Sequence, residues 1–254
     1  MDYCRIIPCL DTKNGRLVKG IHFVELKELG DPAEAGAAYS EAGADELVVL
    51  DITATLEGRK TMLETVRRTV ERIDVPLTVG GGIGSVADAR AILDMGASKV
   101  SVNTAAVRRP EVVKELAEAF GGEKVTVAID TRQNPDMPSG FEVVVSGGTK
   151  PAGRDAVEWA REVENLGAGA ILPTSMDADG TQDGYDIPMT RAIAEAVSLP
   201  VIASGGAGAL EHLKEAVVEG HADAVLVASI AHYGTFTIRQ MKEYLAAEGI
   251  SVRL

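Results

Sequence analysis

The feature that most constrains the fold is a set of eight short apolar runs that recur along the chain. Each run is rich in Val, Ile and Leu, a composition typical of strands that are buried on both faces of a parallel sheet. The runs are RIIPCL (5–10), ELVVLD (46–51), PLTVG (76–80), KVSVN (99–103), KVTVAID (124–130), AILPTS (170–175), PVIASG (200–205) and DAVLVAS (223–229). The segments between them have helical periodicity, so strands and helices are expected to alternate.

Start and stop signals mark the expected helices. Asp31 followed by Pro32 is a helix cap with proline in the first turn, and Ser85 with Asp88 has the spacing of a capping box. Glycines are expected to close several helices. These glycines are Gly43, Gly96, Gly121, Gly167 and Gly220. Eight strands that alternate with eight helices predict an α/β chain folded as a (β/α)8 TIM barrel. An open doubly wound sheet is the alternative, but no GxGxxG motif follows the first strand.

An internal repeat favours the barrel. A shift of 124 residues places Gly43 on Gly167, and it likewise places Gly96 on Gly220. The first strands match at a shift of 119, which places Asp11 on Asp130, so the second half carries about five extra residues in the stretch QNPDMPSG. No linker interrupts the chain. We therefore expect a single domain over residues 1–254, built from half-barrels at roughly 1–122 and 123–254.

The composition excludes several kinds of partner. The 254 residues include 38 acidic and 25 basic ones, which gives a net charge of −13 at pH 7. This charge disfavours nucleic acid and anionic membrane surfaces as partners. No apolar run approaches the roughly 18 residues of a membrane span, and the N-terminus has no signal-peptide pattern, so a cytoplasmic protein is expected.

The cysteines and histidines indicate neither a disulfide nor a metal centre. Cys4 and Cys9 are an odd number of residues apart in one expected strand, so they should lie on opposite faces and stay reduced. None of the histidines has metal-ligand spacing with a second ligand. We expect no metal and no cofactor.

Two carboxylates are candidates for catalysis. In barrels of this kind the active site lies at the C-terminal ends of the strands. Asp11 ends the first expected strand and Asp130 ends the fifth, so the two side chains should face each other across the mouth. A pair of carboxylates in this arrangement can act as general acid and general base. Each could instead cap a turn, but their correspondence in the repeat favours a catalytic role.

Glycine-rich turns at the strand ends are candidates for phosphate binding, because they bring backbone N–H groups close to an anion. One such turn follows the third strand and another follows the seventh, and the repeat relates them. Two phosphate sites on opposite sides imply a long substrate with a phosphate at each end. Including the polar groups at other strand ends, the predicted binding residues are Lys19, Asp51, Gly82, Asn103, Thr104, Thr174, Asp179, Gly180, Ser204, Gly205, Gly206, Ala228 and Ser229.

Three charged residues begin strands at the opposite end of the barrel. Arg5, Glu46 and Lys99 are expected to lie at the N-terminal face, where charges most often pair to close the barrel floor.

Motifs at all eight expected strand ends closely resemble one family. They are IIPCLD (6–11), GRLVKG (15–20), GDPAE (30–34), DELVVLDITAT (45–55), TVGGGI (78–83), VSVNTAAV (100–107), VAID (127–130), DGTQDGYD (179–186) and VIASGGAG (201–208). They resemble the cyclase subunit of imidazole glycerol phosphate synthase along the whole chain. The sister isomerase of histidine biosynthesis is also similar, but CLD and VKGIHF favour the cyclase.

The resemblance implies a lyase that uses ammonia. It would convert the phosphoribulosyl-formimino-aminoimidazole carboxamide ribonucleotide into imidazole glycerol phosphate and aminoimidazole carboxamide ribotide. By similarity, Asp130 would be the general acid and Asp11 the general base. A glutaminase subunit would dock on the N-terminal face as a heterodimer and deliver ammonia through the barrel. Arg5, Glu46 and Lys99 would belong to a charged gate at that entrance.

The chain departs from the family pattern at several positions. The fourth gate position, usually glutamate, is Ala170, and Ser98 and Glu123 replace an aspartate and a glutamine that are common in the family. Nearer the substrate, Thr149, Ala152 and Ala178 replace two arginines and one threonine. Pro173 falls inside an expected central strand, which suggests a bulge or a local break.

Two other functions stay open. One is a barrel without catalytic activity that binds a glutaminase partner or a bisphosphate ligand. The other is the sister isomerase reaction, which uses the same carboxylates and phosphate sites but needs no ammonia. The presence of both aspartates favours catalysis, and a requirement for ammonia separates the cyclase from the isomerase.

Overall fold

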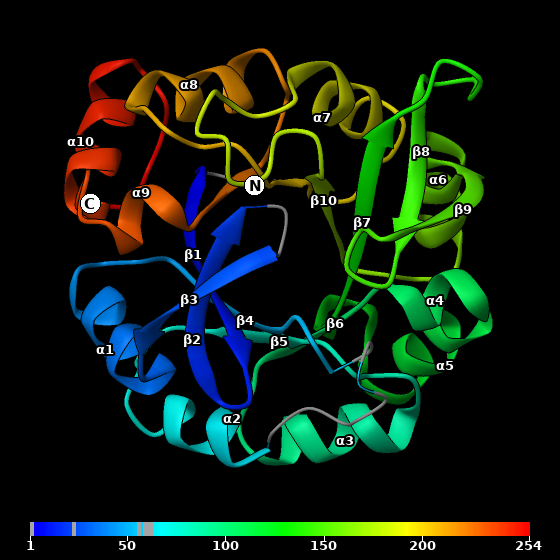
Figure 1. Ribbon diagram of the computed structural model, residues 1–254, viewed down its shortest axis with the longest axis horizontal. Coiled ribbons are helices and arrows are strands. Elements are labelled where there is room, and N and C mark those ends of the chain that lie inside the picture. Colours follow the sequence, from blue (N-terminus) through cyan, green and yellow to red (C-terminus); the bar gives the residue numbers. More distant parts are fainter. Residues whose placement is uncertain (1–2, 22–23, 55–56, 58–62) are drawn as a thin grey trace.

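The fold is a closed barrel of parallel strands (Figure 1). It is seen in a computed structural model that describes residues 3–21, 24–54, 57 and 63–254, with the backbone alone for 19–21 and 24–26. Within these ranges eight strands form the wall, in the order β1 (Arg5–Lys13), β4 (Leu47–Asp51), β5 (Leu77–Gly80), β6 (Lys99–Val102), β7 (Val125–Gln133), β10 (Ala170–Ser175), β11 (Ile202–Ala203) and β12 (Ala224–Val227). Each strand pairs in parallel with the next, and β12 pairs with β1 to close the ring. The predicted (β/α)8 barrel is confirmed.

Helices encircle the strands in Figure 1. The longer ones are α1 (Pro32–Glu41), α2 (Leu63–Val70), α3 (Val86–Asp94), α5 (Glu111–Phe120), α6 (Ala156–Asn165), α7 (Ile187–Ala194), α8 (Leu210–Val218) and α10 (Ile238–Ala247). Two short helices, α4 (Thr104–Arg108) and α9 (Ser229–His232), and a 3-10 turn at Gly122–Lys124 complete the set in the described ranges. None of these helices has the length and apolar character that crossing a membrane requires.

The predicted helix starts are confirmed. The Asp31 carboxylate accepts a hydrogen bond from the N–H of Ala33 at the start of α1, where Pro32 takes the first position. The Ser85 hydroxyl accepts from the N–H of Asp88 at the start of α3, and also donates to the Asp88 carboxylate. Each contact satisfies backbone donors that a helix N-terminus leaves free.

One of the five glycines expected to close helices, Gly220, differs from the others in its backbone conformation. Gly43, Gly96, Gly121 and Gly167 adopt left-handed backbone conformations after helices, as expected, but Gly220 does not. After α8 the left-handed residue is His221, with φ of 56°. Gly220 is needed for a different reason: a Cβ at this position would lie 2.5 Å from the carbonyl oxygen of Ala216.

Two antiparallel hairpins extend the barrel at its mouth, and the sequence patterns missed both. They consist of β2 (Arg16–Ile21) with β3 (Val24–Gly30), and of β8 (Phe141–Val145) with β9 (Lys150–Asp155). The first hairpin continues β1 and the second continues β7, so each half of the repeat begins with a long strand followed by a hairpin. The hairpins therefore extend the internal repeat beyond the barrel wall.

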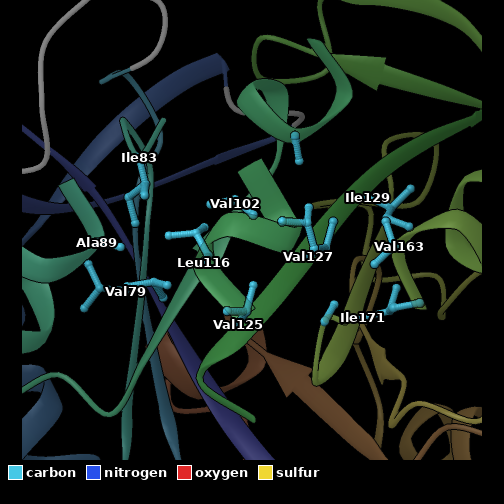
Figure 2. Packing of buried hydrophobic residues seen from close by; sticks show 14 of the residues in the cluster. Val79, Ile83, Ala89, Val102, Leu116, Val125, Val127, Ile129, Val163 and Ile171 are labelled. Carbon is cyan, nitrogen blue, oxygen red and sulfur yellow. The ribbon is translucent and has the colours of Figure 1, made fainter. Parts of the chain in front are cut away.

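Buried apolar side chains form an inner layer and an outer layer. The inner layer fills the barrel, and its members are Ile7, Cys9, Val48, Ala128, Leu172, Ile202, Ala224 and Leu226. The outer layer packs the strands against the helices, and Figure 2 shows part of it between Val79, Val127, Leu116 and Val163. Cys4 lies in the outer layer and Cys9 in the inner one, and both are free thiols, so the prediction that they do not pair is confirmed.

Pro173 breaks the wall on one side only. Strand β10 pairs with β7 in continuous register from Ala170 to Ser175. On its other side, β10 meets β11 only through isolated bridges at Ile171 and Thr174. Proline has no N–H to donate, so the gap between these two bridges falls where the sequence suggested a local break.

A buried ion pair ties the last helix to the barrel floor. The Lys242 ammonium lies 2.8 Å from the Asp45 carboxylate, and both side chains are almost fully buried. Asp45 also accepts a hydrogen bond from the N–H of Ile6 in β1, and Lys242 also donates to the carbonyl of Arg253. The pair thus joins β1, α10 and the C-terminal segment.

Replacing Lys242 with Met is expected to lower the free energy of unfolding by about 3 kcal/mol, because the buried Asp45 carboxylate would lose its buried partner and keep only the exposed Arg253 guanidinium, 3.5 Å away. The matched control is Lys214→Met, which removes an exposed bridge to Glu248 and should cost about 0–1 kcal/mol. Urea unfolding of the full chain measures both. Equal effects for the two variants would contradict this role of the buried pair.

Candidate functional site

Two adjoining hollows form the mouth at the C-terminal ends of the strands. The larger has a volume of about 360 Å³ and lies over β4 to β10. The smaller, about 40 Å³, lies over β1, β10, β11 and β12. Leu50 and Thr174 line both hollows, so the two are joined.

Each hollow contains one of the two predicted catalytic aspartates. Asp11 on β1 lines the smaller hollow, and Asp130 on β7 lines the larger. Both side chains are buried. In a strand alternate residues share a face, so Asp11 points into the barrel with Cys9, and Asp130 does so with Ala128. The structure therefore brings the two carboxylates to opposite parts of one mouth.

Burial changes the chemistry of Asp130. Burial raises the pKa of this carboxyl to about 7, and the nearby charges of Asp179 and Asp11 add to the rise. A hydrogen bond from Asn103 acts in the opposite direction but does not outweigh burial. A carboxyl group with a pKa of about 7 can exchange a proton at neutral pH, which is what a general acid requires.

Asp11 has a different neighbour, which the sequence analysis missed. The Cys9 thiol donates a hydrogen bond to the Asp11 carboxylate, with 3.5 Å between sulfur and oxygen. Cys9 also lines the smaller hollow. The sequence held one signal for this contact, because residues two apart in a strand point to the same side. Arg108, Ser101 and Gly147 also line the larger hollow and were not predicted.

The two aspartates have different hydrogen-bond partners, although the internal repeat relates their positions. The position that matches Cys9 in the second half is Ala128, which has no donor. The residue that takes the place of Asn103 in the second half is Ala228, which likewise directly precedes a short helix, at the end of the strand beside Asp11. One carboxylate therefore has a thiol from its own strand, and the other has an amide from the neighbouring strand. Equivalent positions in the two halves thus have different chemistry.

The glycine-rich turns have matching backbones in the two halves. Gly81 and Gly82 have left-handed conformations, as do Gly205 and Gly206, which match them in the repeat. The turns also press closely against neighbouring strands: a Cβ on Gly205 would lie 2.9 Å from the carbonyl oxygen of Ser175. Only glycine allows both the conformation and the close approach.

The residues before the two short helices also match. Asn103 has φ of −135° and ψ of −95°, and Ala228 has φ of −131° and ψ of −79°. The Thr104 hydroxyl accepts a hydrogen bond from the N–H of Ser146, which fixes the loop after β8 to the edge of the larger hollow.

The structure places almost all the predicted binding residues around the mouth. The larger hollow is lined by Asp51, Gly82, Asn103, Thr104 and Thr174. The smaller one is lined by Thr174, Asp179, Gly180, Ser204, Gly205, Gly206, Ala228 and Ser229. Lys19 is the exception: its backbone lies in β2, but its side chain is outside the described part of the chain.

Two of the family departures near the mouth have internal contacts. The Thr149 hydroxyl donates to the carbonyl of Ser146 and closes the turn between β8 and β9. The Ala178 carbonyl accepts from the hydroxyl of Thr181. Ala152 is partly buried against the outer apolar layer.

The three charged residues at the N-terminal end meet below the barrel interior. Glu46 accepts hydrogen bonds from Arg5 and, at 2.8 Å, from the Lys99 ammonium. Burial alone would raise the pKa of Glu46, but the two cations outweigh it and hold the pKa below its usual range. Ala170 is buried and contributes only a methyl group. The Ser98 hydroxyl accepts from the N–H of Leu77 instead of joining the charged group.

No group of three or more His, Cys, Asp or Glu side chains that could hold a metal ion occurs among the residues that the structure describes.

A comparison with known families agrees with this fold. A model of the histidine biosynthesis protein family matches residues 5–237. The chain belongs to this family of histidine biosynthesis enzymes, which includes both the cyclase and the isomerase.

Replacing Asp130 with Asn is expected to change how stability depends on pH. The folded chain keeps the Asp130 proton up to about pH 7, whereas an ordinary aspartate, with a pKa of 3.8, loses it earlier. The folded state therefore binds more protons between these values, and the contribution of Asp130 to stability falls as pH rises through this window. Relative to the natural chain, Asp130→Asn should gain stability between about pH 5 and 7, by at most about 1.4 kcal/mol per pH unit.

Denaturant unfolding at a series of pH values measures this gain. Asp136→Asn, at an exposed turn position, is the matched control and should show no such trend. Parallel stability curves for Asp130→Asn and the natural chain would show that Asp130 does not titrate in this window.

Proposed function

We propose that this chain is the ammonia-dependent cyclase of the histidine biosynthesis family. Its substrate would be the phosphoribulosyl-formimino-aminoimidazole carboxamide ribonucleotide, and its products imidazole glycerol phosphate and aminoimidazole carboxamide ribotide. A substrate with a phosphate at each end fits two adjoining hollows that each carry a glycine-rich turn and one of the two predicted catalytic aspartates.

One observation favours the cyclase over the isomerase, because both would use this mouth. Arg5, Glu46 and Lys99 form a buried charged group at the far end of the barrel interior. An enzyme that receives ammonia through its barrel would use such a group at the entrance, whereas in an isomerase, which needs no second reactant, these charges would serve only to close the barrel floor. The motifs CLD and VKGIHF point the same way.

The two aspartates have the properties that the proposed steps need. Ammonia must attack a carbonyl group, water must leave, and the imidazole ring must close. Each step moves a proton. Asp130, with a pKa of about 7, would supply protons, and Asp11 on the opposite side would accept them.

The partner would be a glutaminase subunit that docks on the N-terminal face to form a heterodimer. Ammonia released there would pass the charged group and travel through the interior toward Asp11 and Asp130. The isomerase reaction is the second candidate, since the family includes it and the same mouth would hold its bisphosphate substrate.

Turnover by the purified chain alone tests the proposed reaction. With excess ammonium at alkaline pH, the formimino substrate should be consumed, and without ammonium it should not. Asp130→Asn and Asp11→Asn should each lower the rate by about 10²–10⁴-fold, the usual contribution of a general acid or base. Asp136→Asn serves as control and should keep the rate of the natural chain.

Each alternative predicts a different result. Turnover of the isomerase substrate without ammonia would support the isomerase. Substrate binding without any turnover would indicate a barrel that binds its ligand but has no catalytic activity.

Restoring the missing glutamate should change coupling to the partner. Ala170→Glu would add a carboxylate at the charged end, where Arg5 and Lys99 now outnumber Glu46. In complex with a glutaminase, the glutamine-dependent rate should change while the rate with free ammonium stays the same. If neither rate changes, residue 170 has no part in passing ammonia.

A further inference from the structure

The barrel floor contains hydrogen-bond donors without acceptors. Arg5 is only 8% exposed, and one of its terminal nitrogens, Nη1, donates to Glu46. Its Nε and Nη2 atoms are buried, and no described residue accepts a hydrogen bond from either. Buried donors that are left unpaired lose their hydration without compensation, so proteins rarely keep them in this state.

The two unpaired atoms belong to one edge of the guanidinium group. Nε and Nη2 present their N–H bonds side by side and in one plane. This edge matches the two oxygens of a carboxylate, which it binds through two parallel hydrogen bonds. The two unpaired atoms therefore form one complete edge of the guanidinium group, the edge that can bind a carboxylate.

The charge of the floor favours an anion. Arg5 and Lys99 carry two positive charges, and Glu46 carries one negative charge. Both oxygens of Glu46 are already engaged, one by Arg5 and the other by Lys99. One positive charge is left over, which matches a ligand with a single negative charge.

The chain itself has no carboxylate to offer among the described neighbours. Ala224 lies directly opposite Arg5 in the ladder between β1 and β12. Ala170 shares the inward face of β10 with Leu172, so it too presents a methyl group to the interior. The nearest other carboxylates, Asp45 and Asp223, are engaged with Lys242 and with the N–H of Val201.

We propose that the barrel floor binds a small planar oxyanion with one negative charge, of the carboxylate class, through the Nε–Nη2 edge of Arg5. Formate, acetate and bicarbonate have this chemistry. The site lies at the opposite end of the barrel from the two hollows, with the inner apolar layer of Ile7, Cys9 and Leu226 between them. Lys99, whose side chain is 25% exposed, marks the side from which solvent reaches the floor. The proposal does not depend on which reaction the mouth performs.

The test is a titration of the full chain, labelled with ¹⁵N-arginine, with sodium formate at constant ionic strength. Sulfate is left out of this titration, because sulfate would compete with formate for the same edge of Arg5. The resonance of Arg108, which lines the larger hollow, reports any binding at the mouth separately. The Arg5 Nε–H resonance, identified by its loss in Arg5→Lys, should shift and saturate. The resonance of Arg239, an exposed residue paired with Glu243, should not move. About fivefold above the dissociation constant, formate should raise Tm by about 2–4 °C.

Two variants locate the effect. Arg5→Lys keeps the charge but loses the planar edge, so the rise in Tm should disappear. Ala170→Glu supplies a carboxylate from the chain itself, so the Arg5 resonance should already be shifted and formate should add nothing. The measurement on the natural chain stands even if one variant fails to fold.

Three results would overturn the proposal. The first is an Arg5 resonance that does not move up to about 0.1 M formate, where screening already weakens long-range charge effects. The second is a rise in Tm that persists in Arg5→Lys. The third is an equal response to chloride, which would mean that the site does not select a planar oxyanion.

Discussion

Closure of the strand ladder between β1 and β12 is the interaction on which the rest of the structure depends. Arg5 pairs with Ala224, so residues near the two ends of the chain become neighbours in one sheet. Because the ring is closed, the C-terminal ends of all the strands meet at a single mouth, and all the N-terminal ends meet at a single floor. The smaller hollow spans this closure, because residues of β1 and β12 line it together.

Several of the contacts that secure the closure lie at the floor, and one lies nearer the mouth, where a ring nitrogen of His232 is 2.9 Å from the carbonyl oxygen of Cys9. Asp45 holds the N–H of Ile6 and the Lys242 ammonium, and the N–H of Cys4 donates to the carbonyl of Ser251. These contacts are buried and fully paired. The mouth, by contrast, keeps a carboxyl group whose pKa is raised by burial. The buried ion pair of Asp45 and Lys242 therefore lies at the opposite end of the barrel from the carboxyl group with the raised pKa.

Much of the fold could be predicted from the sequence, because in a parallel barrel the place of a residue along its strand decides which end of the barrel it lies at. Each strand contains one apolar run, and the residue that ends the run faces the mouth, so the sequence indicated where Asp11, Asp130 and the glycine-rich turns lie. The two aspartates do not end their strands as predicted, because β1 continues to Lys13 and β7 to Gln133, where each pairs with a hairpin. The hairpins were missed because strands such as RLVKGI and VELKELG mix charged and apolar residues without forming an apolar run. The contact between Cys9 and Asp11 was missed because the thiol was considered only as a disulfide partner. The conformation of Gly220 depends on the close approach of Ala216, which no local pattern contains.

The gap beside Pro173 decides where strand pairing in the barrel wall is interrupted. The internal repeat separates the chain between β6 and β7, yet β7 pairs with β6 over three successive residues, and β1 pairs with β12 over four. Between β10 and β11 only two isolated bridges remain. The interrupted strand pairing of the barrel wall therefore lies within the second half of the repeat and not where the two halves meet. Because Pro173 has no N–H to donate, strand pairing is interrupted inside the second half, whereas it is continuous where the two halves meet.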